Sequence, residues 1–138
     1  MMHNDTLNGK NLWLEFGFVF QTNTAELLNF PERKESLTND WAEENGKEYD
    51  LENPKFHDKE VTLKCLFIAE DEAKFWQGYD AFFAEWKKSG WQSLYVYDHD
   101  RTYQCFYKKT ENFTKLTKRI KREGKVIVSF ELVLVVGN

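Results

Sequence analysis

Three consecutive residues, Asp98, His99 and Asp100, are the best candidates for chemistry in this sequence. Two carboxylates beside an imidazole could bind a divalent cation or act as a general acid and base. Three adjacent residues in a turn, however, rarely converge on one point, and Asp favours turns because its side chain hydrogen-bonds the local backbone. We therefore predict that they form a tight connection between two strands. A hydrolase that uses them is the third of three functional hypotheses.

Other familiar arrangements of catalytic and metal-binding residues are missing from the sequence. Cys65 and Cys105 are too far apart for a Cys-x-x-Cys site, and three histidines are too few for a zinc cluster. Neither a glycine-rich phosphate loop nor a Gly-x-Ser-x-Gly motif occurs. The sequence therefore predicts a protein that is not an enzyme and has no catalytic residues, cofactor or bound metal.

The composition is that of one globular domain spanning residues 1–138, with 41% hydrophobic, 30% charged and 17% aromatic residues. Residues 1–10 are expected to form a flexible N-terminus. They lack the apolar core of a secretory signal, and no stretch approaches the ~18 apolar residues of a membrane span. We expect a protein made in the cytoplasm, without a membrane partner.

Alternating apolar residues predict most of the secondary structure as strands. The expected strands cover residues 12–20, 60–69, 92–97, 102–108 and 126–136, with a ragged strand or loop through Phe113 and Leu116. Gly17 interrupts the first of these and indicates a bulge or a close neighbour. The last strand is apolar on both faces, which is typical of a central strand.

One amphipathic helix is predicted at about residues 71–89. Asp71 is a suitable N-cap, and Gly90 is placed where a left-handed residue could end the helix. One helical face is aromatic and is expected to pack on a sheet; it comprises Phe75, Tyr79, Phe82, Phe83 and Trp86. Six or so strands with a single helix favour a mainly β (α+β) fold, either a β-sandwich or an open barrel flanked by the helix.

Residues 21–58 form a long acidic loop region that separates the first two predicted strands. It contains a short helical possibility at residues 25–28 and turn chemistry at Asn39-Asp40 and Asn45-Gly46. Residues 31–60 hold ten acidic and five basic side chains, whereas residues 101–125 hold nine basic and two acidic ones. The net charge of −4 for the whole chain therefore conceals two segments of opposite sign.

Oppositely charged segments can be solvated faces, can pair within one molecule, or can join neighbouring subunits head to tail. We favour the last interpretation, because complementary charges set the register between partners. The candidate subunit-interface residues are Asp40, Trp41, Glu43, Glu44, Glu48, Asp50, Lys115, Lys118, Arg119, Lys121 and Arg122. A basic hairpin near several tyrosines could instead bind single-stranded nucleic acid.

The order of these features resembles small tail proteins of long-tailed bacteriophages and prophages. The acidic loop contains Gly46-x-x-Tyr49-Asp50-Leu51-x-x-Pro54 and is followed by a strand and the aromatic helix. The segment Tyr103-Gln104-Cys105-Phe106-Tyr107 and a final apolar strand come later. The resemblance covers about residues 12–136 and is to the tail-tube fold, which tube subunits share with the ring domain of distal tail proteins.

This resemblance implies a β-sandwich with one helix, assembled as a ring, commonly a hexamer, around a channel that passes DNA. The loop at residues 36–58 would reach a neighbouring subunit or ring. The second, carbohydrate-binding-like domain of full-length distal tail proteins has no counterpart here, so tube, distal tail and baseplate-ring roles all stay open. We therefore expect a structural subunit of a phage tail that binds copies of itself and other tail proteins. The second hypothesis is a small β-rich binding module for nucleic acid or carbohydrate.

Overall fold

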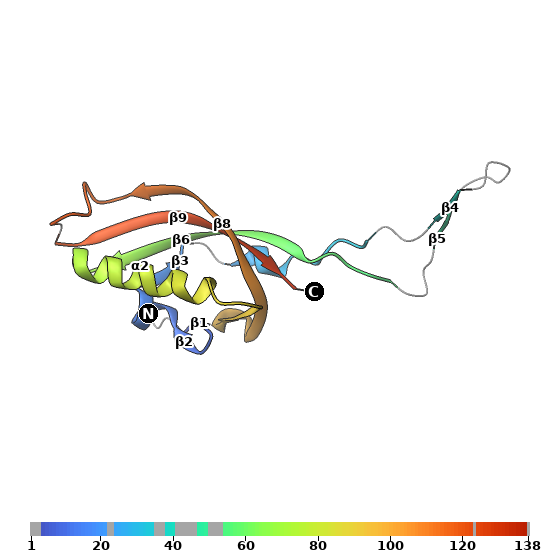
Figure 1. Ribbon diagram of the computed structural model, residues 1–138, viewed down its shortest axis with the longest axis horizontal. Coiled ribbons are helices and arrows are strands. Elements are labelled where there is room, and N and C mark those ends of the chain that lie inside the picture. The colour runs from blue at the N-terminus through green and yellow to red at the C-terminus, as the bar shows by residue number, and fades with distance from the viewer. Residues whose placement is uncertain are drawn as a thin grey trace.

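A seven-stranded antiparallel sheet forms the body of the protein in the computed structural model (Figure 1). The structure describes residues 4–21, 24–34, 38–40, 47–49, 54–122 and 124–137. The strand order is β2–β1–β7–β8–β9–β6–β3. These strands are β1 (Thr6–Leu7), β2 (Lys10–Asn11), β3 (Phe18–Phe20), β6 (Lys59–Ala69), β7 (Gln92–Val96), β8 (Arg101–Lys115) and β9 (Val126–Val136). The fold is mainly β, as predicted, with an open sheet rather than a closed barrel.

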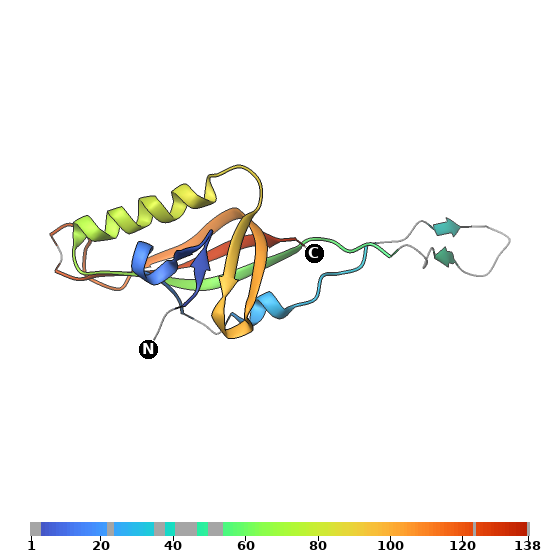
Figure 2. The same ribbon diagram turned by 90° about the horizontal axis from the view of Figure 1, so that it is seen from below.

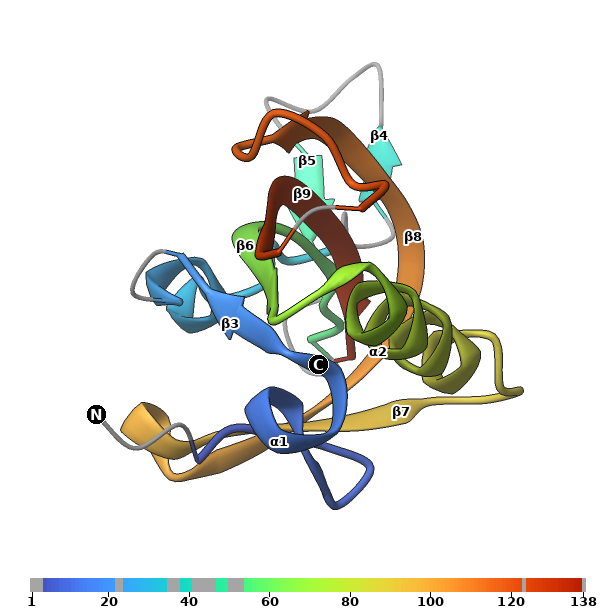
Figure 3. The same ribbon diagram turned by 90° about the vertical axis from the view of Figure 1, so that its left-hand side faces the viewer.

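The helix α2 (Glu72–Trp86) lies against the concave side of the curled sheet (Figure 3). Asp71 caps it as predicted, since its side chain accepts a hydrogen bond from the Lys74 amide. The helix ends earlier than expected, with Lys87 as its C-cap. Gly90 does adopt a positive φ of 78°, but it lies in the loop beyond the helix.

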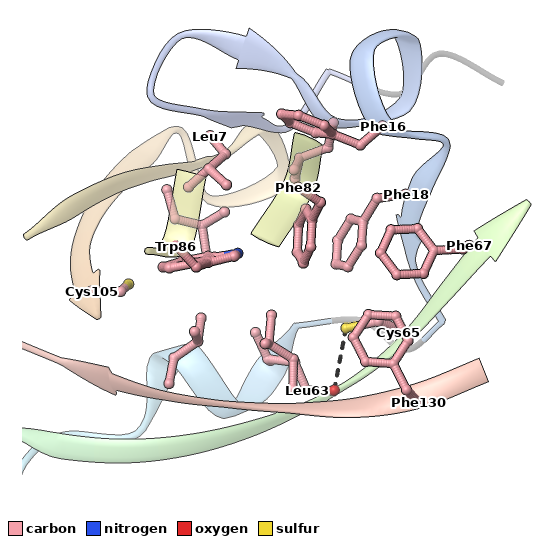
Figure 4. Close-up of a cluster of buried hydrophobic side chains, with 14 of the residues drawn as sticks. Leu7, Phe16, Phe18, Leu63, Cys65, Phe67, Phe82, Trp86, Cys105 and Phe130 are labelled. Carbon is pink, nitrogen blue, oxygen red and sulfur yellow. Dashed lines mark hydrogen bonds between the residues drawn. The ribbon is translucent and has the colours of Figure 1, made fainter. Parts of the chain in front are cut away.

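Aromatic side chains fill the space between α2 and the sheet (Figure 4). Phe82 stacks on Phe18 with ring centroids 4.5 Å apart, and Phe67 stacks on Phe130 at 5.0 Å. The aromatic face predicted for the helix is therefore its buried face. Strand β9 pairs with β6 along its whole length and with β8 on its other side, which confirms the central position expected from its apolar pattern.

Residues 12–16, predicted as part of a strand, instead form the short helix α1 (Leu12–Phe16). The side chain of Asn11 accepts hydrogen bonds from the amides of Trp13 and Leu14, and Gly17 ends the helix with a φ of 67°. Leu12 and Phe16 are then buried on one helical face, while Leu14 is 79% exposed. The prediction of a strand over residues 12–20 is correct only for β3.

Two further predictions of the sequence analysis need correction. The strand predicted at residues 102–108 continues as β8 to Lys115, so the ragged element through Phe113 is part of it. Register shifts at Lys108 and at Asn112–Phe113 allow this long strand to stay paired with β9, and Asn112 adopts a φ of 57°. Asn39 and Asp40, predicted to form a turn, instead lie in strand β4 (Thr38–Asp40), which pairs with β5 (Lys47–Tyr49).

A two-stranded arm projects from the body along the long axis of the molecule (Figure 2). It consists of β4 (Thr38–Asp40) and β5 (Lys47–Tyr49). The 3-10 helix η1 (Ala25–Leu28), predicted as a short helical segment, precedes it. Within the segment expected to be a flexible N-terminus, the described residues 4–10 contribute β1 and the start of β2, and Leu7 is fully buried.

Candidate subunit interface

The predicted basic residues gather at the end of the sheet where β8 connects to β9. Lys115 is the last residue of β8, and the other four lie in the connection; all five are exposed. They are Lys115, Lys118, Arg119, Lys121 and Arg122. The connection is fixed to the body, because Ile120 packs against the core and the Arg122 amide donates a hydrogen bond to Glu72 Oε1 at 3.3 Å.

These five cations take part in no ion pair within the described residues, unlike several other lysines. The ion pairs there are Lys10–Glu85, Lys74–Glu70, Lys88–Glu85, Lys108–Glu60 and Lys109–Glu111. The basic end is therefore a concentration of positive charge without an acidic side chain at pairing distance in the part of the chain that the structure describes. Such a surface attracts an anionic partner.

The predicted acidic residues belong to the arm. Asp40 lies in β4 opposite Lys47, and Glu48 lies in β5 opposite Asn39. Trp41, Glu43, Glu44 and Asp50 fall outside the described residues. Figures 1 and 2 place β4 and β5 at one end of the long axis and the β8–β9 connection at the other. The structure therefore does not bring the described acidic candidates, Asp40 and Glu48, together with the basic ones within one molecule.

Backbone hydrogen bonds pair the two segments at the base of the arm, and a lysine of β6 anchors the 3-10 helix that precedes them. The Lys34 amide donates to the Lys55 carbonyl at 2.7 Å, and the His57 amide donates to the Glu32 carbonyl at 2.8 Å. Lys59 Nζ in β6 donates to the carbonyls of Leu27 and Asn29, which anchors η1. Burial lowers the pKa of Lys59 from its usual value of 10.5, which is consistent with its enclosed position.

A groove of about 920 Å³, not expected from the sequence, lies beside the base of the arm. Its walls come from η1 and the residues after it, from Phe56 and the start of β6, from Trp91 just before β7, from His99 and the start of β8, and from the end of β9. Apolar side chains in these walls include Leu28, Phe30, Phe56, Trp91 and Val136. No periodic pattern could identify this groove, because its walls come from segments far apart in the sequence.

Asp98, His99 and Asp100 form the turn that the sequence predicts. They lie in and just after the 3-10 helix η2 (Tyr97–His99), and Asp100 has a φ of 49°. His99 Nδ1 lies 2.8 Å from the Tyr103 hydroxyl, whereas Asp100 accepts a hydrogen bond from Tyr95. The side chains of His99 and Asp100 thus contact different tyrosines. These contacts hold the turn against strands β7 and β8.

Two further features are missing from the part of the chain that the structure describes. Nowhere in it do three His, Cys, Asp or Glu side chains gather closely enough to hold a metal ion. No helix in it has the length and apolar character needed to cross a membrane.

No protein-family model matches this chain, and no curated protein matches its sequence. A solved structure similar to it is the Dit (gp 19.1) protein of phage SPP1, described as a paradigm of the hub adsorption apparatus of phages that infect Gram-positive bacteria. The two superpose with a TM-score of 0.60 and 12% identity over 96% of this chain. The chain has a phage tail-type fold. This confirms the fold expected from the resemblance to tail proteins; the chain spans about half of Dit, since the match covers 49% of that protein.

Proposed function

We propose that this protein is a non-enzymatic structural subunit of a phage or prophage tail. The observation that carries the proposal is the similarity of almost the whole chain to Dit, a protein of a phage hub adsorption apparatus. Among the tube, distal tail and baseplate-ring roles, this neighbour supports the distal tail. The partners would be copies of this chain and other tail proteins, and the site of action would be the virion tail.

Self-association is supported by the separation of charge along the molecule. The basic connection between β8 and β9 and the arm with Asp40 and Glu48 lie at opposite ends of the long axis (Figure 1). Opposite charges placed in this way cannot pair within one copy, but each can meet its complement on the next. Repeated head-to-tail contacts of this kind close into a ring when the rotation between copies allows it. A ring would leave a central channel through which DNA could pass.

Native mass spectrometry and sedimentation velocity over a range of protein and salt concentrations test this proposal. We expect a ring-sized oligomer that forms at high protein concentration and dissociates as salt rises, since salt screens exposed charges. The variant Lys118→Gln/Arg119→Gln/Lys121→Gln/Arg122→Gln should associate at least tenfold more weakly with an unchanged circular dichroism spectrum. A wild-type protein that stays monomeric at every soluble concentration contradicts self-association.

A control is needed to distinguish two reasons for weaker association: the lower net positive charge of the variant, and the loss of contacts made by the basic end. The double variant Lys118→Gln/Lys121→Gln removes two charges from the basic end, and Lys64→Gln/Lys87→Gln removes two from exposed positions elsewhere on the body. We expect only the first pair to weaken association. Equal weakening by both would show that net charge, and not contact at the basic end, controls assembly.

A further inference from the structure

The groove at the base of the arm is lined by several large apolar side chains that are exposed. Phe30 is 80% exposed, Leu28 is 64% exposed and Trp91 is 47% exposed, and all three line this one groove. A single exposed apolar residue on a protein surface is ordinary, whereas an apolar patch marks a contact site. Three such residues in one concavity therefore need an explanation.

Both walls of the groove are held in place by contacts within the chain. The Phe30 ring meets the ring of Phe56 edge-on, with centroids 5.6 Å apart. The Trp91 ring packs against Phe106 at 5.4 Å and against Gly137, where a Cβ atom would come within 3.3 Å of it. The walls of the groove are therefore ordered before any partner binds. Binding would cost little free energy for ordering these side chains.

Charge pairing at the ends of the molecule would not hold an assembly together by itself. Each exposed ion pair contributes little to affinity and weakens as salt rises. Stable interfaces combine a polar rim that sets the register with an apolar core that supplies most of the affinity. The charged ends can set the register, and the apolar core has to come from exposed apolar side chains elsewhere on the surface.

The position of the groove indicates which partner would cover it. Phe30 and Phe56 are continuous with the paired segments at the base of the arm, where Arg33 bridges to Phe56. A copy that packs against the base of the arm would therefore also meet the groove. The charged residues of its lining are of both signs, namely Asp58, Lys59 and Arg101, and Lys59 already donates to the carbonyls of Leu27 and Asn29. A lining of mixed charge suits a protein partner better than a polyanion.

We propose that this groove is the apolar core of the contact with a second copy of the chain. The inference rests on the proposed function, because it assumes that the arm reaches a neighbouring copy. It adds the surface that supplies the affinity, whereas the charged ends supply the register.

Sedimentation velocity on single serine variants tests the inference. Phe30→Ser and Leu28→Ser should each weaken association of the full chain at least tenfold, with an unchanged circular dichroism spectrum, because both side chains are exposed. Leu14→Ser is the matched control: Leu14 is 79% exposed on α1 and does not line this groove. We expect it to associate like the wild type.

The possible outcomes separate the groove from the proposed function. If the wild type associates and both groove variants associate equally well, the groove is not the core of the contact, while self-association stands. If Leu14→Ser weakens association as much as Phe30→Ser does, the effect is not specific to the groove and the inference is wrong. If the wild type stays monomeric at every soluble concentration, both the groove inference and proposed self-association are overturned.

Discussion

Asn8 Nδ2 donates a hydrogen bond of 3.0 Å to Glu85 Oε1, which joins the turn between β1 and β2 to the last turn of α2. The same Glu85 carboxylate also accepts from Lys10 at 3.0 Å and from Lys88 at 2.9 Å, although its side chain is only 5% exposed. A buried carboxylate with three donors is stabilised in its charged form. This cluster ties the N-terminal edge of the sheet to the helix.

Acid should therefore weaken the fold through Glu85. Burial by itself would raise the pKa of Glu85, but the hydrogen bonds from Lys88, Asn8 and Lys10 outweigh it and lower the pKa from 4.5 to about 2. Because the folded pKa is the lower one, the stabilisation is complete above about pH 5 and disappears as the pH falls toward 2. We expect a loss of roughly 3 kcal/mol in the free energy of unfolding across this window, measured by urea titration.

Replacement of Glu85 should remove this pH dependence. Glu85→Gln keeps the shape of the side chain but leaves two lysines without their acidic partner, so we expect about 2–4 kcal/mol of destabilisation at pH 7. Glu60→Gln is the control, since the Glu60–Lys108 pair is half exposed and should contribute less than about 1 kcal/mol. An acid-induced loss of stability as large in Glu85→Gln as in the wild type would assign that loss to other groups.

Gly78 allows α2 to approach α1 closely, and Gly78→Ala should disrupt this contact. A Cβ atom at residue 78 would come within 2.3 Å of the Phe16 carbonyl oxygen, which is backbone and cannot rotate away. We expect a loss of about 1–3 kcal/mol in thermal or urea unfolding. Gly124→Ala, where a Cβ atom would meet nothing within 4 Å, should be nearly neutral. Equal stability of the two variants would contradict this account of the helix contact.

The short helix α1 should depend on its cap. Asn11→Ala removes the side-chain oxygen that accepts from the Trp13 and Leu14 amides, and we expect a cost of about 1 kcal/mol in the free energy of unfolding. Asn11→Asp restores an acceptor and should recover most of the loss. If Asn11→Asp is as unstable as Asn11→Ala, capping is not the reason for the effect.

The two thiols should be unreactive in the folded protein. Cys65 and Cys105 are both fully buried and unpaired. Burial raises the pKa of Cys65 above its usual range and that of Cys105 to about 12, so little thiolate exists at pH 8. A chromogenic aromatic disulfide, which reacts with thiolates, should label neither cysteine of the folded protein at this pH. After denaturant is added it should label both. Rapid labelling of the native protein would show that one of the strands opens readily.

Helix α2 and strands β6 and β9 could be predicted from the sequence because local pattern and burial agree in each. In α2 the aromatic residues recur every three or four positions, in β6 the buried apolar residues alternate with less buried ones, and β9 is apolar on both faces, as a central strand is. At residues 12–16 the pattern fits both a strand and a helix. Leu12, Leu14 and Phe16 would share one face of a strand, and Leu12 and Phe16 also share one face of a helix. The cap at Asn11 and the close packing of Gly17 against the Ile68 carbonyl favour the helix.

The candidate interface divides in the same way between local and tertiary information. The sequence by itself determined that one segment is acidic and another basic, because charge is a property of residue type alone. Only the tertiary structure decided that they lie at opposite ends of the long axis, and that η1, the start of β6, the start of β8 and the end of β9 together line an apolar groove. These relationships depend on the order of strands in the sheet, which pairs β1 with β7 across almost ninety residues through backbone hydrogen bonds that any sequence can make.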